Sequence, residues 1–139
     1  AGMLLAHRIL MDKLPEEIRA DINKPEYYFI GSNELYSFFA MNNLARWNDQ
    51  KYKSEEGMRA DYPLIVEEFL NSQFPSDIIE KLEEILVKVG DCPLIVRSSS
   101  LLEDTFGTAF AGKYESYFLG NQGNMKEKLK ALLEAIAKV

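Results

Sequence analysis

The sequence has few of the residues that build disulfides, zinc sites or membrane spans. Cys92 is its one cysteine and His7 its one histidine among 139 residues. A single cysteine excludes an internal disulfide and suits a reducing compartment, so we expect a cytoplasmic protein. The apolar runs are only a few residues long, as at Met3–Ala6, whereas a helix that crosses a bilayer needs about 20. The sequence therefore predicts neither a disulfide-rich domain nor a membrane-spanning one.

The chain also has fewer basic than acidic side chains. The chain carries 16 basic and 22 acidic side chains, for a net charge of -6. Nucleic-acid binding normally needs a basic stripe, and surface binding to membranes needs a basic amphipathic helix; the sequence shows neither, so we expect neither partner. Its 47% apolar residues are typical of a globular chain. This length predicts one domain, or a piece of a larger one.

Most of the chain has a helical pattern. Apolar residues repeat at the 3.6-residue period, most clearly in Ser76–Val89, where Gly90 supplies a stop signal. Pro63 either kinks the helix around it or starts a new one. Asn124 and Glu127 form a start signal for the last helix. Helices are predicted in Met3–Leu14, in a short segment after Pro15, in Ser32–Leu44, around Glu55, in Ser76–Val89 and after Asn124.

Three segments are predicted to be strands. Tyr27–Ile30 is a short aromatic and β-branched run. Pro93–Val96 has no polar alternation, which favours a strand buried on both faces. Lys113–Leu119 alternates, so that Tyr114, Ser116 and Phe118 share one face. Trp47–Ser54 is polar and is interpreted as an exposed connection. The predicted fold class is α+β, with a small mixed sheet packed against helices.

The segment 93–119 carries the residues suited to chemistry. Arg97 follows the buried strand directly, and a guanidinium is the cation that best matches two phosphate oxygens. A loop rich in glycine and alanine follows it, and such a loop lets backbone amides approach a ligand closely. The candidate residues between them are Ser98, Ser99, Ser100, Glu103 and Asp104. This pattern is compatible with phosphate binding.

Structural readings of the same residues remain open. Arg97 beside Glu103 and Asp104 is often just an ion pair, a serine run is often a turn, and a Gly/Ala loop often has no ligand. The segment 107–113 (GTAFAGK) matches part of a Walker A loop. That motif must follow a strand and open a helix, whereas here it precedes a strand, so we reject it.

Other kinds of active site find little support. The serines at 98–100 lack the Ser-x-x-Lys and Gly-x-Ser-x-Gly patterns of serine nucleophiles. His7 lies in an amphipathic helix and is interpreted as a surface or boundary residue. Cys92 alone makes no zinc site and is interpreted as a small apolar filler before the strand.

The segment 93–119 resembles part of a known protein family. Four segments follow each other in the order of a family signature: Val96–Ser100, Glu103-Asp104, Phe110–Gly112 and Tyr114–Leu119. It is the signature of the N-terminal, ATP-binding (PEP/pyruvate-binding) domain of phosphoenolpyruvate synthase and pyruvate phosphate dikinase. The resemblance implies an ATP-grasp-like fold, in which two α+β subdomains close over ATP.

The resemblance also implies roles for individual residues. Arg97 matches the arginine that holds the ATP phosphates, and Gly112 matches a glycine whose backbone approaches the nucleotide. Ser116 stands where the family has a nucleotide-contacting threonine, and it keeps the hydroxyl. The segment 105–111 would be a mobile lid. The possible supporting residues are Ser98, Ser99, Glu103 and Asp104.

Departures from the family pattern define what we expect of this chain. The family's phosphate-binding lysine would precede Ala1, and its metal-binding subdomain and phosphohistidine domain would follow Val139. Leu101-Leu102 and Lys113 replace residues that are usually small and Gln. We therefore expect residues 1–139 to be a single partial domain, the first subdomain, with 93–119 as its signature strand-loop-strand. Mg²⁺ would accompany ATP, with ligands largely outside this chain.

Two functions follow as hypotheses. In the first, the chain is the ATP-binding portion of a phosphotransferase that moves phosphate from ATP to a histidine on another domain, and then to an acceptor such as pyruvate. Its partners would be the nucleotide and the remaining domains of the parent protein. In the second, the domain is a catalytically silent nucleotide-sensing or interaction module. A Gly-Gly-Lys motif and metal-binding carboxylates elsewhere in the parent gene would favour the enzyme.

Overall fold

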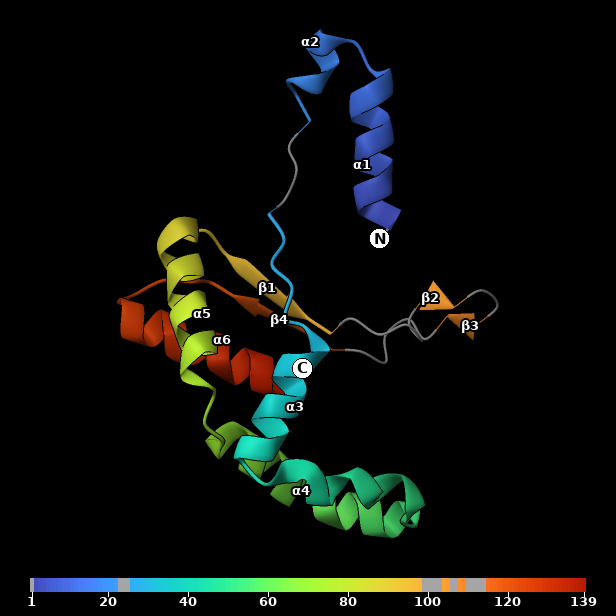
Figure 1. Cartoon of the computed structure of the whole chain (residues 1–139), viewed down its shortest axis with the longest axis vertical. Helices are drawn as coiled ribbons and strands as arrows, with labels where there is room; N and C mark the ends of the chain where they lie inside the picture. Colours follow the sequence, from blue (N-terminus) through green and yellow to red (C-terminus); the bar gives the residue numbers. More distant parts are fainter. Residues whose placement is uncertain (1, 23–25, 99–103, 106–107, 110–114) are drawn as a thin grey trace. The chain divides into compact units, whose positions relative to one another are not determined.

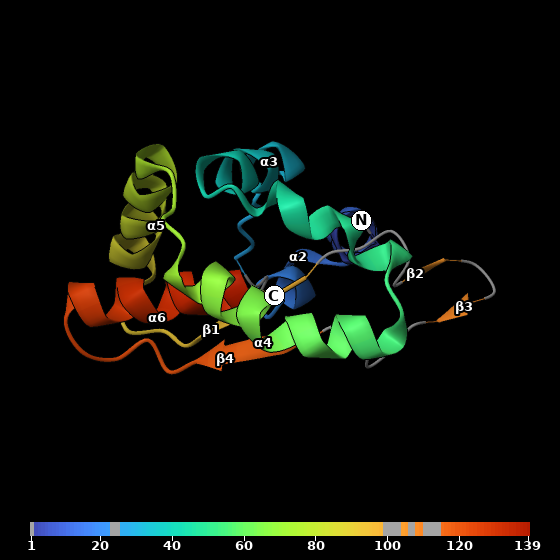
Figure 2. The same cartoon turned by 90° about the horizontal axis from the view of Figure 1, so that it is seen from below.

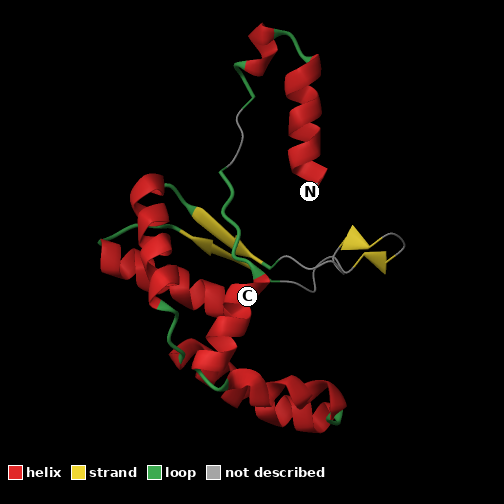
Figure 3. Ribbon diagram, in the orientation of Figure 1, coloured by secondary structure: helices red, strands yellow, loops and turns green. Residues whose placement is uncertain are grey.

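The computed structural model describes residues 2–22, 26–98, 104–105, 108–109 and 115–139 (Figure 1). The chain divides into two compact units, Ala1–Gly31 and Ser32–Val139. Helices make up most of both units, and the strands lie in the second (Figure 3). The predicted α+β class is confirmed. None of the helices in the described ranges is long and apolar enough to cross a membrane.

The first unit consists of helix α1 (Gly2–Lys13) and the short helix α2 (Glu16–Arg19), as predicted. His7 is half-buried on α1, which agrees with a boundary residue. The predicted strand at Tyr27–Ile30 is wrong, because these residues have no regular structure and all four are exposed. Aromatic and β-branched side chains favour a strand only where the backbone has a partner to pair with.

The helices of the second unit begin and end close to the predicted residues. Ser54 caps α4 through its side-chain oxygen, which accepts a hydrogen bond from the Gly57 amide at 3.2 Å. Pro63 lies inside α4 and does not end it. Asn124 and Glu127 form the predicted capping box of α6. The elements are α3 (Ser32–Met41), the 3-10 helix η1 (Leu44–Tyr52), α4 (Glu55–Asn71), α5 (Ser76–Val89) and α6 (Met125–Lys138).

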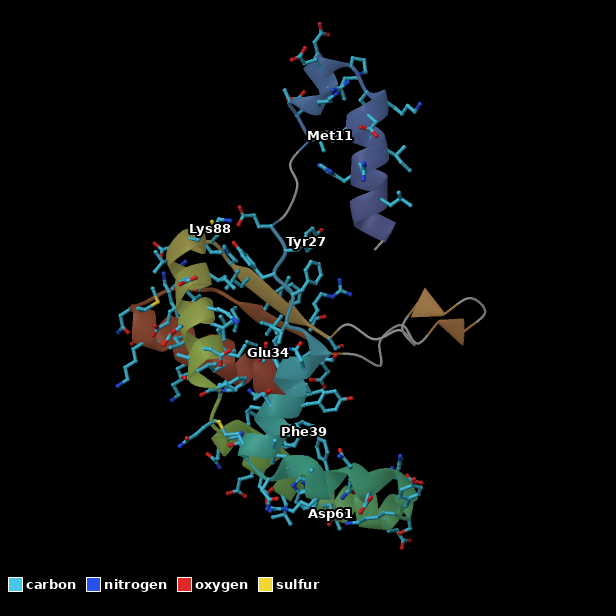
Figure 4. All side chains as sticks on the ribbon, in the orientation of Figure 1. Met11, Tyr27, Glu34, Phe39, Asp61 and Lys88 are labelled. Carbon is cyan, nitrogen blue, oxygen red and sulfur yellow. The ribbon has the colours of Figure 1, made fainter. Side chains whose placement is uncertain are left out.

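Trp47–Ser54 is mostly exposed, as predicted, but the expected irregular connection is wrong, since most of the segment belongs to η1. Side chains of η1 bind acceptors on α4, and these tertiary contacts override the polar composition. Gln50 donates to Asp61 at 2.9 Å, and Asp61, labelled in Figure 4, also accepts from Lys53. An aromatic cluster joins α3 to α4, where the ring of Phe39, also labelled in Figure 4, meets that of Phe69 edge-on at 5.5 Å.

A two-stranded antiparallel sheet lies against α5 and α6 (Figure 2). Strand β1 (Leu94–Arg97) pairs with β4 (Ser116–Leu119), and this strand pair is called the hairpin from here on. The four buried residues of the core come from the two helices, and the inner face of the sheet packs on them. They are Ile78, Leu82, Leu86 and Leu132, and the inner-face residues are Leu94, Val96 and Leu119. The prediction that β1 is buried on both faces is wrong, because its burial alternates.

A second, shorter pair of strands lies in the stretch predicted to be a loop. Strands β2 (Asp104–Thr105) and β3 (Thr108–Ala109) pair antiparallel. In the described part of the chain all strand pairs are antiparallel, so the expected mixed sheet is not seen there. The ATP-grasp-like architecture stays a prediction.

Two buried polar side chains, Asn121 and Lys128, fix the turn between α5 and β1; we call them the turn clamp. The Asn121 amide donates to the carbonyl oxygens of Gly90 and Cys92, both at 2.9 Å. The Lys128 ammonium donates to Gly90 at 3.0 Å and pairs with Asp91 at 2.5 Å. Cys92 is exposed, so its interpretation as an apolar filler is wrong; its backbone carbonyl, rather than its thiol, is held.

We expect Asn121→Ala to lower the free energy of unfolding by about 1–3 kcal/mol, because two buried hydrogen bonds are lost. Asn121 also has a left-handed backbone, with φ of 53°, which a glycine adopts without strain. The matched variant Asn121→Gly separates the two effects, since it keeps the backbone freedom and lacks the amide. Urea denaturation checks this prediction. A change below about 0.5 kcal/mol in both variants, the range of an ordinary surface substitution, would contradict it.

Candidate nucleotide site on the outer face of the hairpin

The strand register brings together two of the residues predicted to bind nucleotide. Arg97 is the partner of Ser116 in the β1–β4 pair. Directly opposed residues have Cβ atoms about 4.5–5.5 Å apart, so both side chains reach the same ligand group. The two residues are 19 positions apart in sequence (116 − 97), and only the antiparallel pairing makes them neighbours.

Both side chains belong to the outer face of the sheet. Burial alternates along β1 and β4, and the exposed positions are Ile95, Arg97, Ser116 and Phe118. Three of the half-buried positions, Leu94, Val96 and Leu119, pack on the helices. A guanidinium and a hydroxyl thus stand on a face open to solvent, as a site for an anionic ligand requires.

The remaining predicted residues lie in different places. Ser98 continues the inner alternation, and its hydroxyl is buried without a hydrogen-bond partner in the described structure. It therefore does not share the exposed face of Arg97. Asp104 begins β2. Ser99, Glu103 and Gly112 lie outside the described residues, and the predicted lid at 105–111 is described only in part.

Magnesium finds no complete site in the part of the chain that the structure describes. No group of three or more His, Cys, Asp or Glu side chains gathers there that could hold a metal ion. Mg²⁺ prefers several oxygen ligands in octahedral geometry. The described residues thus do not form a complete Mg²⁺ site by themselves.

A hollow of about 530 Å³ lies elsewhere, on η1 and α4. Its cation, Arg46, is paired with Glu68 at 2.5 Å, and the Trp47 indole donates to the same carboxylate at 2.7 Å. Glu67 also lines it. Two carboxylates and one paired guanidinium disfavour a polyphosphate in this hollow.

The contacts between η1 and α4 predict a dependence on pH. Hydrogen bonds from Trp47 and Arg46 lower the pKa of Glu68, with Trp47 as the larger cause. Hydrogen bonds from Lys53 and Gln50 lower the pKa of Asp61, with Lys53 as the larger cause. A carboxyl group whose pKa is lowered by folding stabilises the protein at pH values above its unfolded pKa, which is about 4. This contribution to stability is lost as the pH falls through the folded pKa.

We therefore expect the melting temperature of the second unit to fall as the pH is lowered below about 4. Glu68→Gln should lower the melting temperature near neutral pH and make this dependence shallower. The control Glu84→Gln removes an exposed carboxylate from α5. Equal acid sensitivity in the native protein and in Glu68→Gln would show that the Glu68 contacts do not contribute.

Comparison with family models matches residues 10–139 to the pyruvate phosphate dikinase, AMP/ATP-binding domain. The chain belongs to this family. The resemblance drawn from the signature at 93–119 is thereby confirmed, and the chain carries an AMP/ATP-binding region of the pyruvate phosphate dikinase type. Comparisons with curated proteins and with solved structures gave no match.

The match to the pyruvate phosphate dikinase family covers the whole second unit, including β1 and β4. Sequence reasoning gave no role to Ile95 and Phe118, which share the exposed face with Arg97 and Ser116. The alternation of β4 already placed Phe118 beside Ser116. The signal missing from the sequence was the register that brings Ile95 opposite Phe118.

Proposed function

We propose that this chain is the ATP-binding portion of a phosphotransferase that transfers phosphate from ATP to a histidine on another domain, and from there to an acceptor such as pyruvate. The observation that carries the proposal is the pairing of Arg97 with Ser116 on the exposed face of a domain of the pyruvate phosphate dikinase AMP/ATP-binding family. The remaining domains of the parent protein are its partners.

Phosphoryl transfer requires an accurately positioned phosphate and positive charge around it. Phosphoryl transfer proceeds through a loose transition state whose charge is spread over the phosphate oxygens, so the protein contributes mainly by alignment and electrostatics. The Arg97 guanidinium would bind two phosphate oxygens through its planar fork. The Ser116 hydroxyl, opposite in register, would donate to a third oxygen and fix the rotation of the phosphate.

The test of this proposal is chemical. The protein product of the complete parent gene is incubated with ATP, and the phosphorylated species is examined for acid lability and base stability, which identify phosphohistidine. We expect phosphohistidine to form in the native protein and to fall strongly in Arg97→Ala. A parent protein that binds ATP and forms no phosphohistidine would contradict the transfer step.

A further expectation concerns the 139-residue chain alone. We expect it to fold and to show no ATP turnover, because the proposed reaction passes the phosphate to a histidine on another domain. Phosphate release measured over hours checks this. Robust hydrolysis that disappears in Arg97→Ala would contradict it.

A further inference from the structure

An exposed aromatic side chain lies beside the proposed phosphate site. Phe118 is 81% exposed, the largest value among the big apolar residues of the described chain. Ile95 is its partner in the register and is 48% exposed. A Phe side chain left in water sacrifices roughly 1.5–3 kcal/mol of burial, so this arrangement favours a ligand that covers it.

We propose that Phe118, with Ile95 beside it, is the platform on which the base of the bound nucleotide stacks. The proposal rests on the proposed function, because it takes Arg97 and Ser116 as the phosphate end of the same site. It adds the residues that hold the base, and with them the orientation of the nucleotide along the hairpin.

The spacing of the two pairs supports this assignment. Ile95–Phe118 and Arg97–Ser116 are separated by two positions on each strand, so they lie on one face about 7 Å apart. A mononucleotide has its base and its phosphates on opposite sides of the ribose. Laid along the hairpin, it would place the base over Phe118, the ribose between the pairs and the phosphates within reach of the long Arg97 side chain.

The ends of the two strands agree with this orientation. Arg97 ends β1 and Ser116 begins β4, so the proposed phosphate end is the end of the strand pair at which these two termini meet. The base end lies toward Leu94 and Leu119, where the outer-face residues are apolar. The cationic and apolar ends of the face thus match the two ends of a nucleotide.

Stacking on one phenyl ring distinguishes poorly between bases, because every base has a π-face. The platform therefore holds a purine without selecting adenine by hydrogen bonds. GTP and ATP should both depend on Phe118, to a similar extent.

The experiment compares a ligand that has a base with one that lacks it. ATP and inorganic tripolyphosphate are titrated into the 139-residue chain, with binding followed by backbone amide NMR shifts. The variants are Phe118→Ala, Phe118→Trp and Arg97→Ala. Tyr36→Ala, which removes a 71% exposed aromatic ring on α3, is the matched control.

We expect Phe118→Ala to weaken ATP binding about tenfold, the scale of one stacking contact, and to leave tripolyphosphate binding unchanged. Phe118→Trp should retain ATP binding, Arg97→Ala should weaken both ligands, and Tyr36→Ala should weaken neither. Unchanged ATP affinity in Phe118→Ala, with both ligands weakened in Arg97→Ala, would overturn the platform and leave the proposed function standing. Equal weakening of both ligands in Phe118→Ala would also overturn it. If Arg97→Ala weakens neither ligand, the proposed function itself fails.

Discussion

Replacing Arg97 by alanine is expected to weaken ATP binding by about ten- to a hundredfold while the fold stays intact. A hydrogen bond to a charged group contributes about 1.5–3 kcal/mol, and each 1.4 kcal/mol is a factor of ten in affinity. Arg97 is exposed at the end of β1 and adds nothing to the buried core, so its loss should leave the circular dichroism spectrum unchanged.

The control for this variant must remove the same charge at another place. Arg59→Ala is suited, because Arg59 is 78% exposed on α4 and pairs only with Glu55 of the same helix among the ion pairs described. Both variants take one positive charge from a chain of net charge -6. Arg97→Lys should recover part of the affinity, since an ammonium keeps the charge and lacks the fork. Equal affinities in Arg97→Ala and Arg59→Ala would show that only overall charge matters.

The second large effect is expected in the core. Leu86 is 1% exposed and belongs to the cluster that α5 and α6 build beneath the sheet. Leu86→Ala should lower the free energy of unfolding of the second unit by about 2–5 kcal/mol, through lost burial and the cavity that remains. The sheet packs on this cluster, so nucleotide binding should fail at temperatures where the native chain still binds.

The neighbouring residue gives a matched control. Val87 is 71% exposed on the same helix, and Val87→Ala should change the free energy of unfolding by less than about 0.5 kcal/mol. Trp47, the one tryptophan, lies in the second unit and reports its unfolding by fluorescence in urea. Similar midpoints for Leu86→Ala and Val87→Ala would mean that α5 does not pack as described.

The sequence predicts those elements whose periodicity and capping agree with their tertiary environment. In α5 the 3.6-residue repeat, the stop at Gly90 and the buried face all coincide, so both ends were predicted correctly. The alternation in β4 and the capping box at Asn124 are equally local signals. Arg97 and Ser116 could be chosen as candidates because their order along the chain resembles the family signature, and their role in binding stays a prediction.

Other features depend on contacts that no local pattern encodes. Tyr27–Ile30 has strand-forming side chains and no strand, while η1 has a polar sequence and forms because Trp47 and Gln50 find acceptors on α4. The pairing register of β1 and β4 joins residues far apart in sequence. For this reason Phe118 could be assigned to a face, and its partner Ile95 could not.

The most direct test of the account is to map where ATP contacts the isotope-labelled chain. Amide shifts on titration with a non-hydrolysable ATP analogue should be largest at 95–97 and 116–118, the outer face of the hairpin. The hollow lined by Arg46 and Asn71 should remain unshifted. Shifts centred on that hollow, with the hairpin unaffected, would contradict the assignment of Arg97 and Ser116 as the nucleotide site.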